Sequence, residues 1–277
     1  MTDTQALIAT DEDRALKAKH RAVWASGDYA TLASELIWSL GPRLVEATGI
    51  RPGDRVLDIA AGSGNAAIPA ALRGARVVAS DLTPELFDTG RQHATEAGVE
   101  LEWRTADAEY LPFDADSFDV VLSCVGVMFA PHHRLAADEI IRATRRGGRI
   151  GLLSWTPSGF IGRMFATMKP FNAPLPPGAQ PAPLWGDEAH VRELFGDRID
   201  DVSAVRERVR IDRFGSGAEF RDYFKTHYGP TIAVYARIAA DPEQVAALDA
   251  ALAELGDNQL RDGAMEWEYL LFTAKVA

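Results

Sequence analysis

The sequence predicts an α/β fold in which a mostly parallel sheet carries helices on both faces. Apolar runs of strand length alternate with helical stretches from about residue 55 to residue 155, the pattern of a doubly wound sheet. The alternation stops after Trp155, and two further strand-like runs follow late in the chain. The 277 residues, 47% of them hydrophobic, suffice for one large domain with a buried core.

Residues 1–48 are expected to form an N-terminal helical cap. The segment 10–13, Thr-Asp-Glu-Asp, is typical of a capping box and opens a helix that ends near Ala25. A second amphipathic helix is expected over residues 30–47. Proline, glycine and aspartate at 52–54 then form a turn before the first strand.

Residues 49–155 hold the alternating elements and form the predicted cofactor-binding core. Strands are expected at 55–60, 75–80, 99–105, 118–124 and 149–155, and helices at 65–73, 84–97 and 134–145. Parallel strands bring their carboxyl ends to one edge of the sheet, and ligands bind beyond that edge. The loops that follow the strands are therefore the expected site.

Residues 156–277 are predicted to complete the same domain with helices around the substrate and two last strands. Helices are expected at 159–168, 187–194, 217–225, 230–239 and 242–255, and strands at 203–214 and 266–276. A proline-rich loop at 170–183 separates the first two of these helices.

The composition argues against nucleic acid and membrane as partners. The formal net charge is −11, whereas a duplex binder clusters Lys and Arg to displace counterions from phosphates. The arginines at 142, 145, 146 and 149 are interpreted as a solvated helix end. The longest charge-free apolar stretch, 120–133, is too short to span a bilayer and contains Pro131.

The cysteine content and the N-terminus indicate a cytoplasmic protein. Cys124 is the only cysteine, so there is no disulfide framework and no metal-type cysteine spacing. A reducing compartment suits such a chain. Residues 1–14 are acidic and lack the basic-then-apolar layout of a signal peptide. We expect no bound metal, and a homodimer is a candidate assembly.

The loop after the first strand is the first candidate binding element. Residues 56–68 read VLDIAAGSGNAAI, so Gly62 and Gly64 follow a buried strand and precede a helix. The loop satisfies the looser dinucleotide fingerprint GxGxxA, with Asp81 at the distance expected for a ribose contact. Taken alone, it fits a dinucleotide and a sulfonium cofactor equally.

Acidic positions after three successive strands favour one of these cofactors. Asp58 ends the first strand, where an anionic pyrophosphate disfavours a carboxylate and a cationic sulfonium favours one. Asp81 ends the second strand and can accept both ribose hydroxyls. Asp107 follows the third strand and can accept from an adenine amino group, while the Ala108 N–H meets a ring nitrogen. The set favours a positively charged adenosyl cofactor.

Four motifs occur in order between residues 50 and 155. They read VLDIAAGSGN, VVASDLTPE, TADAEYLPFDADSFDVVLS and RRGGRIGLLSW. In order and spacing they resemble the class I S-adenosylmethionine-dependent methyltransferases, above all the menaquinone/ubiquinone C-methyltransferase-like (type 11) branch. The resemblance implies a Rossmann-like, seven-stranded, mostly parallel sheet with an antiparallel last strand, N-terminal helices and a helical lid inserted after strand five.

The resemblance also implies how S-adenosylmethionine is held, with S-adenosylhomocysteine as the product. The loop would pass beneath the methionine portion, Asp81 would hold the ribose, Leu82 would lie against the adenine, and Ser123 would lie near the methionine. The predicted cofactor residues are Asp58, Ala60, Gly62, Gly64, Asp81, Leu82, Asp107, Ala108 and Ser123.

Three departures separate the chain from the quinone methylases. The turn before the fifth strand, Arg-Arg-Gly-Gly at 145–148, lacks the usual proline. Their Glu-x-Ser after the fifth strand is replaced by Leu-Leu-Ser-Trp at 152–155, and their N-terminal tyrosine-aspartate-methionine-asparagine signature is missing. The resemblance therefore supports the cofactor more than a quinone substrate.

Aromatic side chains in loops beyond the same sheet edge predict an apolar substrate site. The candidates are Trp24, Tyr29, Met128, Phe129, Trp155, Phe165 and Tyr228. Methyl transfer is an in-line displacement that needs alignment and desolvation, and a base only where the nucleophile loses a proton. His227 and His132 are the candidate bases, and no metal-ligand spacing or hydrolase triad is found.

The predicted function is methyl transfer to oxygen, carbon or nitrogen of an apolar small molecule. A cyclase or decarboxylase that binds the same cofactor without methylating would keep every motif. An NAD(P)-binding oxidoreductase is disfavoured by Asp58 and Asp107, and a binding module without catalysis is a further alternative. The sequence at 123–126, Ser-Cys-Val-Gly, lacks the Asn/Asp-Pro-Pro-aromatic motif of nucleic-acid methyltransferases.

Overall fold

One seven-stranded sheet in the order β3-β2-β1-β4-β5-β7-β6 forms the centre of the molecule. The computed structural model describes residues 10–277; the first nine residues, on which the expectation about a signal peptide partly rests, lie outside this range. The strands are β1 (Arg55–Ile59), β2 (Arg76–Asp81), β3 (Glu102–Thr105), β4 (Phe118–Cys124), β5 (Thr144–Trp155), β6 (Ile199–Ile211) and β7 (Met265–Val276).

The first five strands are parallel, and β7 runs antiparallel between β5 and β6. In the centre of the sheet, Leu57 lies opposite Val78 on one side and Val121 on the other. Such strands are apolar on both faces because helices cover both. The predicted mostly parallel sheet with an antiparallel last strand is confirmed.

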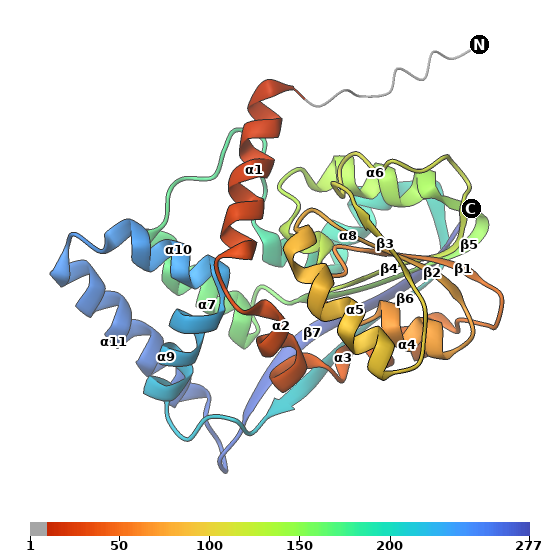
Figure 1. Cartoon of the computed structure of the whole chain (residues 1–277). Coiled ribbons are helices and arrows are strands. Elements are labelled where there is room, and N and C mark those ends of the chain that lie inside the picture. The colour runs from red at the N-terminus through yellow and green to blue at the C-terminus, as the bar shows by residue number, and fades with distance from the viewer. Residues whose placement is uncertain (1–9) are drawn as a thin grey trace.

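Helices surround the sheet on both faces and at one side (Figure 1). The α-helices are α1 (Asp11–Ala25), α2 (Tyr29–Leu32), α3 (Leu40–Thr48), α4 (Ala67–Leu72), α5 (Phe87–Glu96), α6 (His133–Ala143), α7 (Phe160–Met168), α8 (Glu188–Phe195), α9 (Gly217–His227), α10 (Gly229–Ile238) and α11 (Pro242–Gln259). One-turn helices are η1 (Ala33–Ile37, a π-helical turn), η2 (Pro84–Leu86), η3 (Val127–Phe129), η4 (Lys169–Phe171), η5 (Ala182–Gly186) and η6 (Gly196–Arg198).

Helices α3, α4 and α5 lie on one face of the sheet and α6 and α8 on the other, while α7, α9, α10 and α11 gather in a separate helical layer beside the sheet (Figure 1). Helix α1 packs on α10. No helix within residues 10–277 is both long and apolar enough to cross a bilayer.

The start of α1 confirms the expected cap, since the Thr10 hydroxyl accepts from the Asp13 N–H at 3.1 Å. The single helix expected over 30–47 is wrong: α2, η1 and α3 replace it. Pro42 explains why a new helix begins here. Proline has no N–H that could bond to the carbonyl of residue 38, and it is tolerated only in the first turn of a helix. Helix α3 begins at Leu40, which places Pro42 in that position.

The helices of the lid follow the order along the chain that the sequence predicts, with one helix directly after the fifth strand and three between the last two strands. Only α7 follows β5 directly, whereas α9, α10 and α11 lie between β6 and β7. The helical layer is therefore inserted mainly before the last strand.

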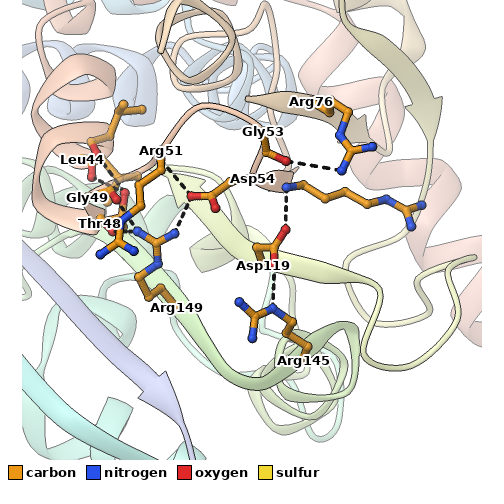
Figure 2. Close-up of polar contacts among 12 residues, drawn as sticks. Leu44, Thr48, Gly49, Arg51, Gly53, Asp54, Arg76, Asp119, Arg145 and Arg149 are labelled. Atoms are coloured by element: carbon orange, nitrogen blue, oxygen red, sulfur yellow. Dashed lines mark hydrogen bonds and ion pairs between the residues drawn. The ribbon is translucent and has the colours of Figure 1, made fainter. Parts of the chain in front are cut away.

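Arg142 lies in the last turn of helix α6, but the other three arginines of the run belong to strand β5, which begins at Thr144, so the interpretation as a helix end is wrong for them. Figure 2 shows Arg145 and Arg149 in a polar network at the amino-terminal edge of the sheet. Arg145 Nε donates to Asp119 Oδ1 at 2.5 Å, and Arg149 pairs with Asp54. These pairs join the starts of β1, β4 and β5, at the edge opposite the expected site.

Candidate active site

An open cavity lies beyond the carboxyl ends of the parallel strands, and side chains of α1 form part of its wall. Its wall includes six of the predicted cofactor residues: Ala60, Gly62, Asp81, Leu82, Asp107 and Ala108. They come from the loops after β1, β2 and β3, so the topology brings together residues up to about fifty positions apart.

The loop after β1 turns through left-handed backbone conformations. Ala60 has φ of 56°, Gly62 55° and Gly64 91°. A Cβ on Gly64 would lie 3.0 Å from both Ile68 and Trp103, so this glycine serves close packing of the loop. Ala60 adopts a conformation that costs a non-glycine residue about 1–2 kcal/mol. Ala60 and Gly62 line the cavity, whereas Gly64 lies behind them.

Asp81 fixes the shape of this loop. Its Oδ2 accepts from the Gly62 N–H at 2.8 Å, and its Oδ1 accepts from the Thr83 N–H at 2.8 Å. Burial raises the pKa of the Asp81 carboxyl, and these N–H groups oppose that shift. The carboxylate therefore joins the ends of β1 and β2 where both border the cavity.

Asp107 connects the cavity wall to the N-terminal helix. Its Oδ1 accepts from Lys17 Nζ at 3.1 Å and from the Glu109 N–H at 3.0 Å. Lys17 also pairs with Glu109 at 2.6 Å. A second ion pair, Arg21 with Glu85 at 2.6 Å, ties α1 to the loop region after β2. Helix α1 is thus joined to two sides of the cavity.

Asp58 lies at the end of β1 with its side chain in the interior. It does not line the cavity, and neither carboxylate oxygen has a hydrogen-bond partner among the described residues. Burial raises the pKa of Asp58 to about 8; the Ala67 N–H opposes the shift without reaching hydrogen-bond geometry. Its carboxyl group is therefore set behind the loop rather than on the wall.

Ser123 has a local structural role. Its hydroxyl donates to the Ile59 carbonyl at 2.7 Å and accepts from the Val127 N–H at 2.8 Å. A Cβ on Gly126 would lie 2.5 Å from the Ala60 carbonyl oxygen, so the loops after β1 and β4 touch here. Ser123 holds these loops together and does not line the cavity.

A second, smaller cavity adjoins the first. Its lining residues are Tyr29, Leu32, Ile37, Val125, Phe129, Trp155, Ile161, Phe224, Tyr228 and Trp267. Tyr29, Val125 and Phe129 line both cavities, and no residue that lines the second carries a charged group. An uncharged, aromatic-walled space thus adjoins the first cavity.

Some of the predicted substrate residues line a cavity, and the others lie behind its wall. Tyr29, Phe129, Trp155 and Tyr228 line the second cavity. Trp24 lines the first, with its ring centre 5.4 Å from that of Tyr29, 4.7 Å from Phe129 and 5.7 Å from Tyr228.

Phe165 and Met128 line neither cavity. The Phe165 ring centre lies 6.0 Å from that of Phe129 and 6.4 Å from Tyr228, and Met128 is fully buried. Both residues therefore support the wall from behind.

The two candidate bases lie outside both cavities. His227 stacks on Tyr223 with ring centres 4.3 Å apart, and its Nδ1 lies 3.0 Å from the Tyr223 carbonyl. His132 Nδ1 lies 2.9 Å from Glu109 Oε2. Neither ring lines a cavity wall.

His20 and Lys17 on α1 line the first cavity, and neither belongs to the predicted site. The spacing of Lys17, His20 and Trp24 places all three on one helix face, and this signal could have found them. Burial, reinforced by the Lys17 charge, lowers the pKa of His20, so its imidazole is neutral near pH 7.

Comparison with known proteins shows which proteins this chain is similar to. Residues 57–152 match a family model described as a methyltransferase domain. The chain is 54% identical over 266 residues to the uncharacterised protein Rv1403c of Mycobacterium tuberculosis, covering 96% of this chain and 97% of that protein. It is 36% identical over 123 residues to a demethylmenaquinone methyltransferase of Clavibacter sepedonicus, covering 43% and 48% of the two chains.

The chain belongs to the class I S-adenosylmethionine-dependent methyltransferases. The fold agrees, since the YcgJ protein of Bacillus subtilis superposes with a TM-score of 0.58 at 22% identity, covering 86% of this chain and 97% of that one. The cofactor of this methyltransferase is S-adenosylmethionine, and solved structures of the same fold hold that molecule or S-adenosylhomocysteine.

The first cavity of the methyltransferase fits such a group. The carboxylates of Asp81 and Asp107 on its wall suit hydroxyl and amino groups, and the backbone of Ala60 and Gly62 forms a wall with little side chain.

Proposed function

We propose that this methyltransferase transfers the methyl group to an uncharged, apolar small molecule held in the second cavity. The observation that carries the proposal is the uncharged lining of that cavity, which shares Tyr29, Val125 and Phe129 with the cofactor cavity. An ionised acceptor would enter this space without a counter-charge from the protein, which is costly. An apolar acceptor gains from leaving water there.

We assign the cofactor contacts to residues on the first cavity wall. Asp81 accepts hydrogen bonds from ribose hydroxyls, and Asp107 with the Ala108 N–H recognises the adenine edge. Ala60, Gly62 and Leu82 contact the remaining portions, while Asp58, Gly64 and Ser123 support them from behind. When bound, S-adenosylmethionine supplies an activated methyl group on a positively charged sulfur.

The residues of the chain contribute alignment and exclusion of water. The rings of Trp24, Tyr29, Phe129 and Tyr228 meet where the two cavities join. Burial raises the pKa of Tyr29 and of Tyr228, so both hydroxyls keep their protons at neutral pH. These hydroxyls can donate to an oxygen of the acceptor and so orient it, while the apolar walls exclude water.

A proton acceptor is needed only if the nucleophile must lose a proton. His20 is the better placed histidine for that role, because it lines the cofactor cavity and is neutral near pH 7. His132 and His227, which were predicted as bases, remain predictions without a contact to either cavity.

Two measurements test the proposal. Saturation with S-adenosylhomocysteine at 100 times its dissociation constant is expected to stabilise the chain by about 2.7 kcal/mol in thermal unfolding. Cofactor with a labelled methyl group, offered with phenols, polyketides and demethylmenaquinone, is then expected to label one of these acceptors.

The outcomes separate the alternatives. Conversion of an acceptor with the label retained on the cofactor would favour the cyclase or decarboxylase. Absence of any stabilisation by either adenosyl ligand would contradict the cofactor assignment itself.

A further inference from the structure

Three potential metal ligands converge beside the cofactor cavity. Asp13 comes from α1, Glu109 from the loop after β3, and His132 directly precedes α6. Each offers one ligand atom, and these atoms all lie within 4.8 Å of one another. Carboxylate oxygen and imidazole nitrogen are typical ligands of divalent first-row metal ions.

Asp13 lacks the partner that a buried carboxylate needs. Its side chain is only 9% exposed, and neither oxygen accepts a hydrogen bond from any described residue. Oδ1 faces His132, whose Nδ1 lies 3.9 Å away. Leaving such a group uncompensated is costly.

Lys17 does not supply the missing partner. Its Nζ lies 2.6 Å from Glu109 and 3.1 Å from Asp107, and it makes no hydrogen bond to Asp13. The buried Asp13 oxygens therefore remain without a donor among the described residues, and a metal ion held between Asp13, Glu109 and His132 would supply their missing partner.

We propose that Asp13, Glu109 and His132 bind one divalent transition-metal ion such as Zn²⁺ or Mn²⁺. An ion about 2.0–2.2 Å from each ligand requires neighbouring ligand atoms some 3 Å apart. His132 Nδ1 and Glu109 Oε2 already lie 2.9 Å apart. Nδ1 must be unprotonated to bind metal, so any proton it shares with Glu109 is released on binding.

The site lies where an ion would affect cofactor binding. Asp13 is one helical turn before Lys17 on α1, and Glu109 is two residues after Asp107. The ion therefore fastens the first turn of α1 to the loop that borders the adenine end of the cavity. The Arg21–Glu85 pair ties the next part of α1 to the other side. The inference is independent of the acceptor and of methyl transfer.

The test is a calorimetric titration of the full chain, first stripped with a chelator, with Zn²⁺ and separately with Mn²⁺. One ion per chain is expected for at least one of them, with proton release that varies with buffer ionisation enthalpy. Asp13→Asn and His132→Gln are each expected to weaken binding at least tenfold. Asp11→Asn, two residues earlier on the exposed side of α1, is the matched control and is expected to bind like the parent.

Two outcomes would overturn the proposal: no saturable binding by the parent chain, or equal binding by the parent and Asp13→Asn. Thermal unfolding checks that each variant folds, and Asp13→Asn keeps the size of the side chain. The dissociation constant of S-adenosylhomocysteine, measured with and without metal, is expected to rise several-fold when the ion is removed. Failure to bind S-adenosylhomocysteine under any condition would contradict the cofactor assignment. The metal proposal would still be decided by the number of ions bound per chain in the titration.

Discussion

The carboxyl group of Asp58 is buried at the end of β1, and burial raises its pKa to about 8. In the unfolded chain the same group ionises near pH 4. Between these values the folded state holds a proton that the unfolded state has lost, so stability of the cofactor-free chain falls as pH rises from 4 to 8.

Asp58→Asn is expected to remove this dependence. Its free energy of unfolding in urea should decline less than that of the parent between pH 5 and pH 8, by at most about 1.4 kcal/mol per pH unit. Asp88→Asn, at an exposed position on α5, is the control and should follow the parent. Parallel curves for the parent and Asp58→Asn would show that Asp58 is ionised in the folded chain.

Asp81→Asn is expected to weaken binding of S-adenosylhomocysteine by about 10- to 100-fold in calorimetry. The amide offers one acceptor where the carboxylate offers two, and its NH₂ group faces a backbone N–H of Gly62 or Thr83. Asp88→Asn again serves as control. Affinity equal to that of the parent would exclude Asp81 from the cofactor site.

Six residues of the recognisable motifs line one cavity, whereas Asp58, Gly64 and Ser123 of the same motifs lie behind its wall. Asp81, Leu82 and Asp107 follow strands whose ends any sheet of this topology brings together. His20 lies on a helix outside the motif region, and its position depends on how α1 packs. Met128, next to Phe129 on η3, lies behind the wall. Its side could not be predicted, because the spacing of residues does not fix how a single helical turn is rotated.

At the scale of elements, α1 depends on exposed ion pairs for part of its attachment. Arg21→Gln removes the pair with Glu85, whose side chains are about half exposed. The dissociation constant of S-adenosylhomocysteine is expected to rise about two- to fivefold at low salt, and the difference should vanish near 1 M salt as screening becomes complete.

Arg91→Gln is the matched control for this variant, because Arg91 pairs with Asp88 within α5 and does not touch α1. A salt-independent change in Arg21→Gln, or an equal change in Arg91→Gln, would contradict the role of the pair in holding α1.

Strands and most helices were predicted within a few residues because hydrophobic periodicity reports burial directly. Two departures involve backbone irregularities. The break within 30–47 contains a π-helical turn in addition to the restart at Pro42, and the early start of β5 accompanies a shift in register between β4 and β5. Periodicity is nearly blind to such single-residue departures.

Across the whole molecule, Trp267 on β7 joins the sheet to the helical layer. Its ring stacks on Phe160 of α7 at 5.7 Å and meets Phe220 and Phe224 of α9. Trp267→Ala is expected to cost about 3–5 kcal/mol of unfolding free energy and to lower the thermal midpoint by roughly 6–20 °C.

Val205→Ala on β6, where the valine is 45% exposed, is the control and should change stability by less than about 0.5 kcal/mol. A loss in Trp267→Ala no larger than in this control would mean that the helical layer does not depend on the sheet for its stability.

The position of β7 between β5 and β6 has a consequence for synthesis in the cell. When β6 leaves the ribosome, the edge of β5 and both edges of β6 have no neighbour, and three helices must be made before β7 appears. During that interval the nascent chain presents these three open strand edges to other chains, which invites aggregation. A slow codon or a stall between α9 and α11 would lengthen the exposure, so translation speed over residues 212–264 should influence the yield of folded enzyme.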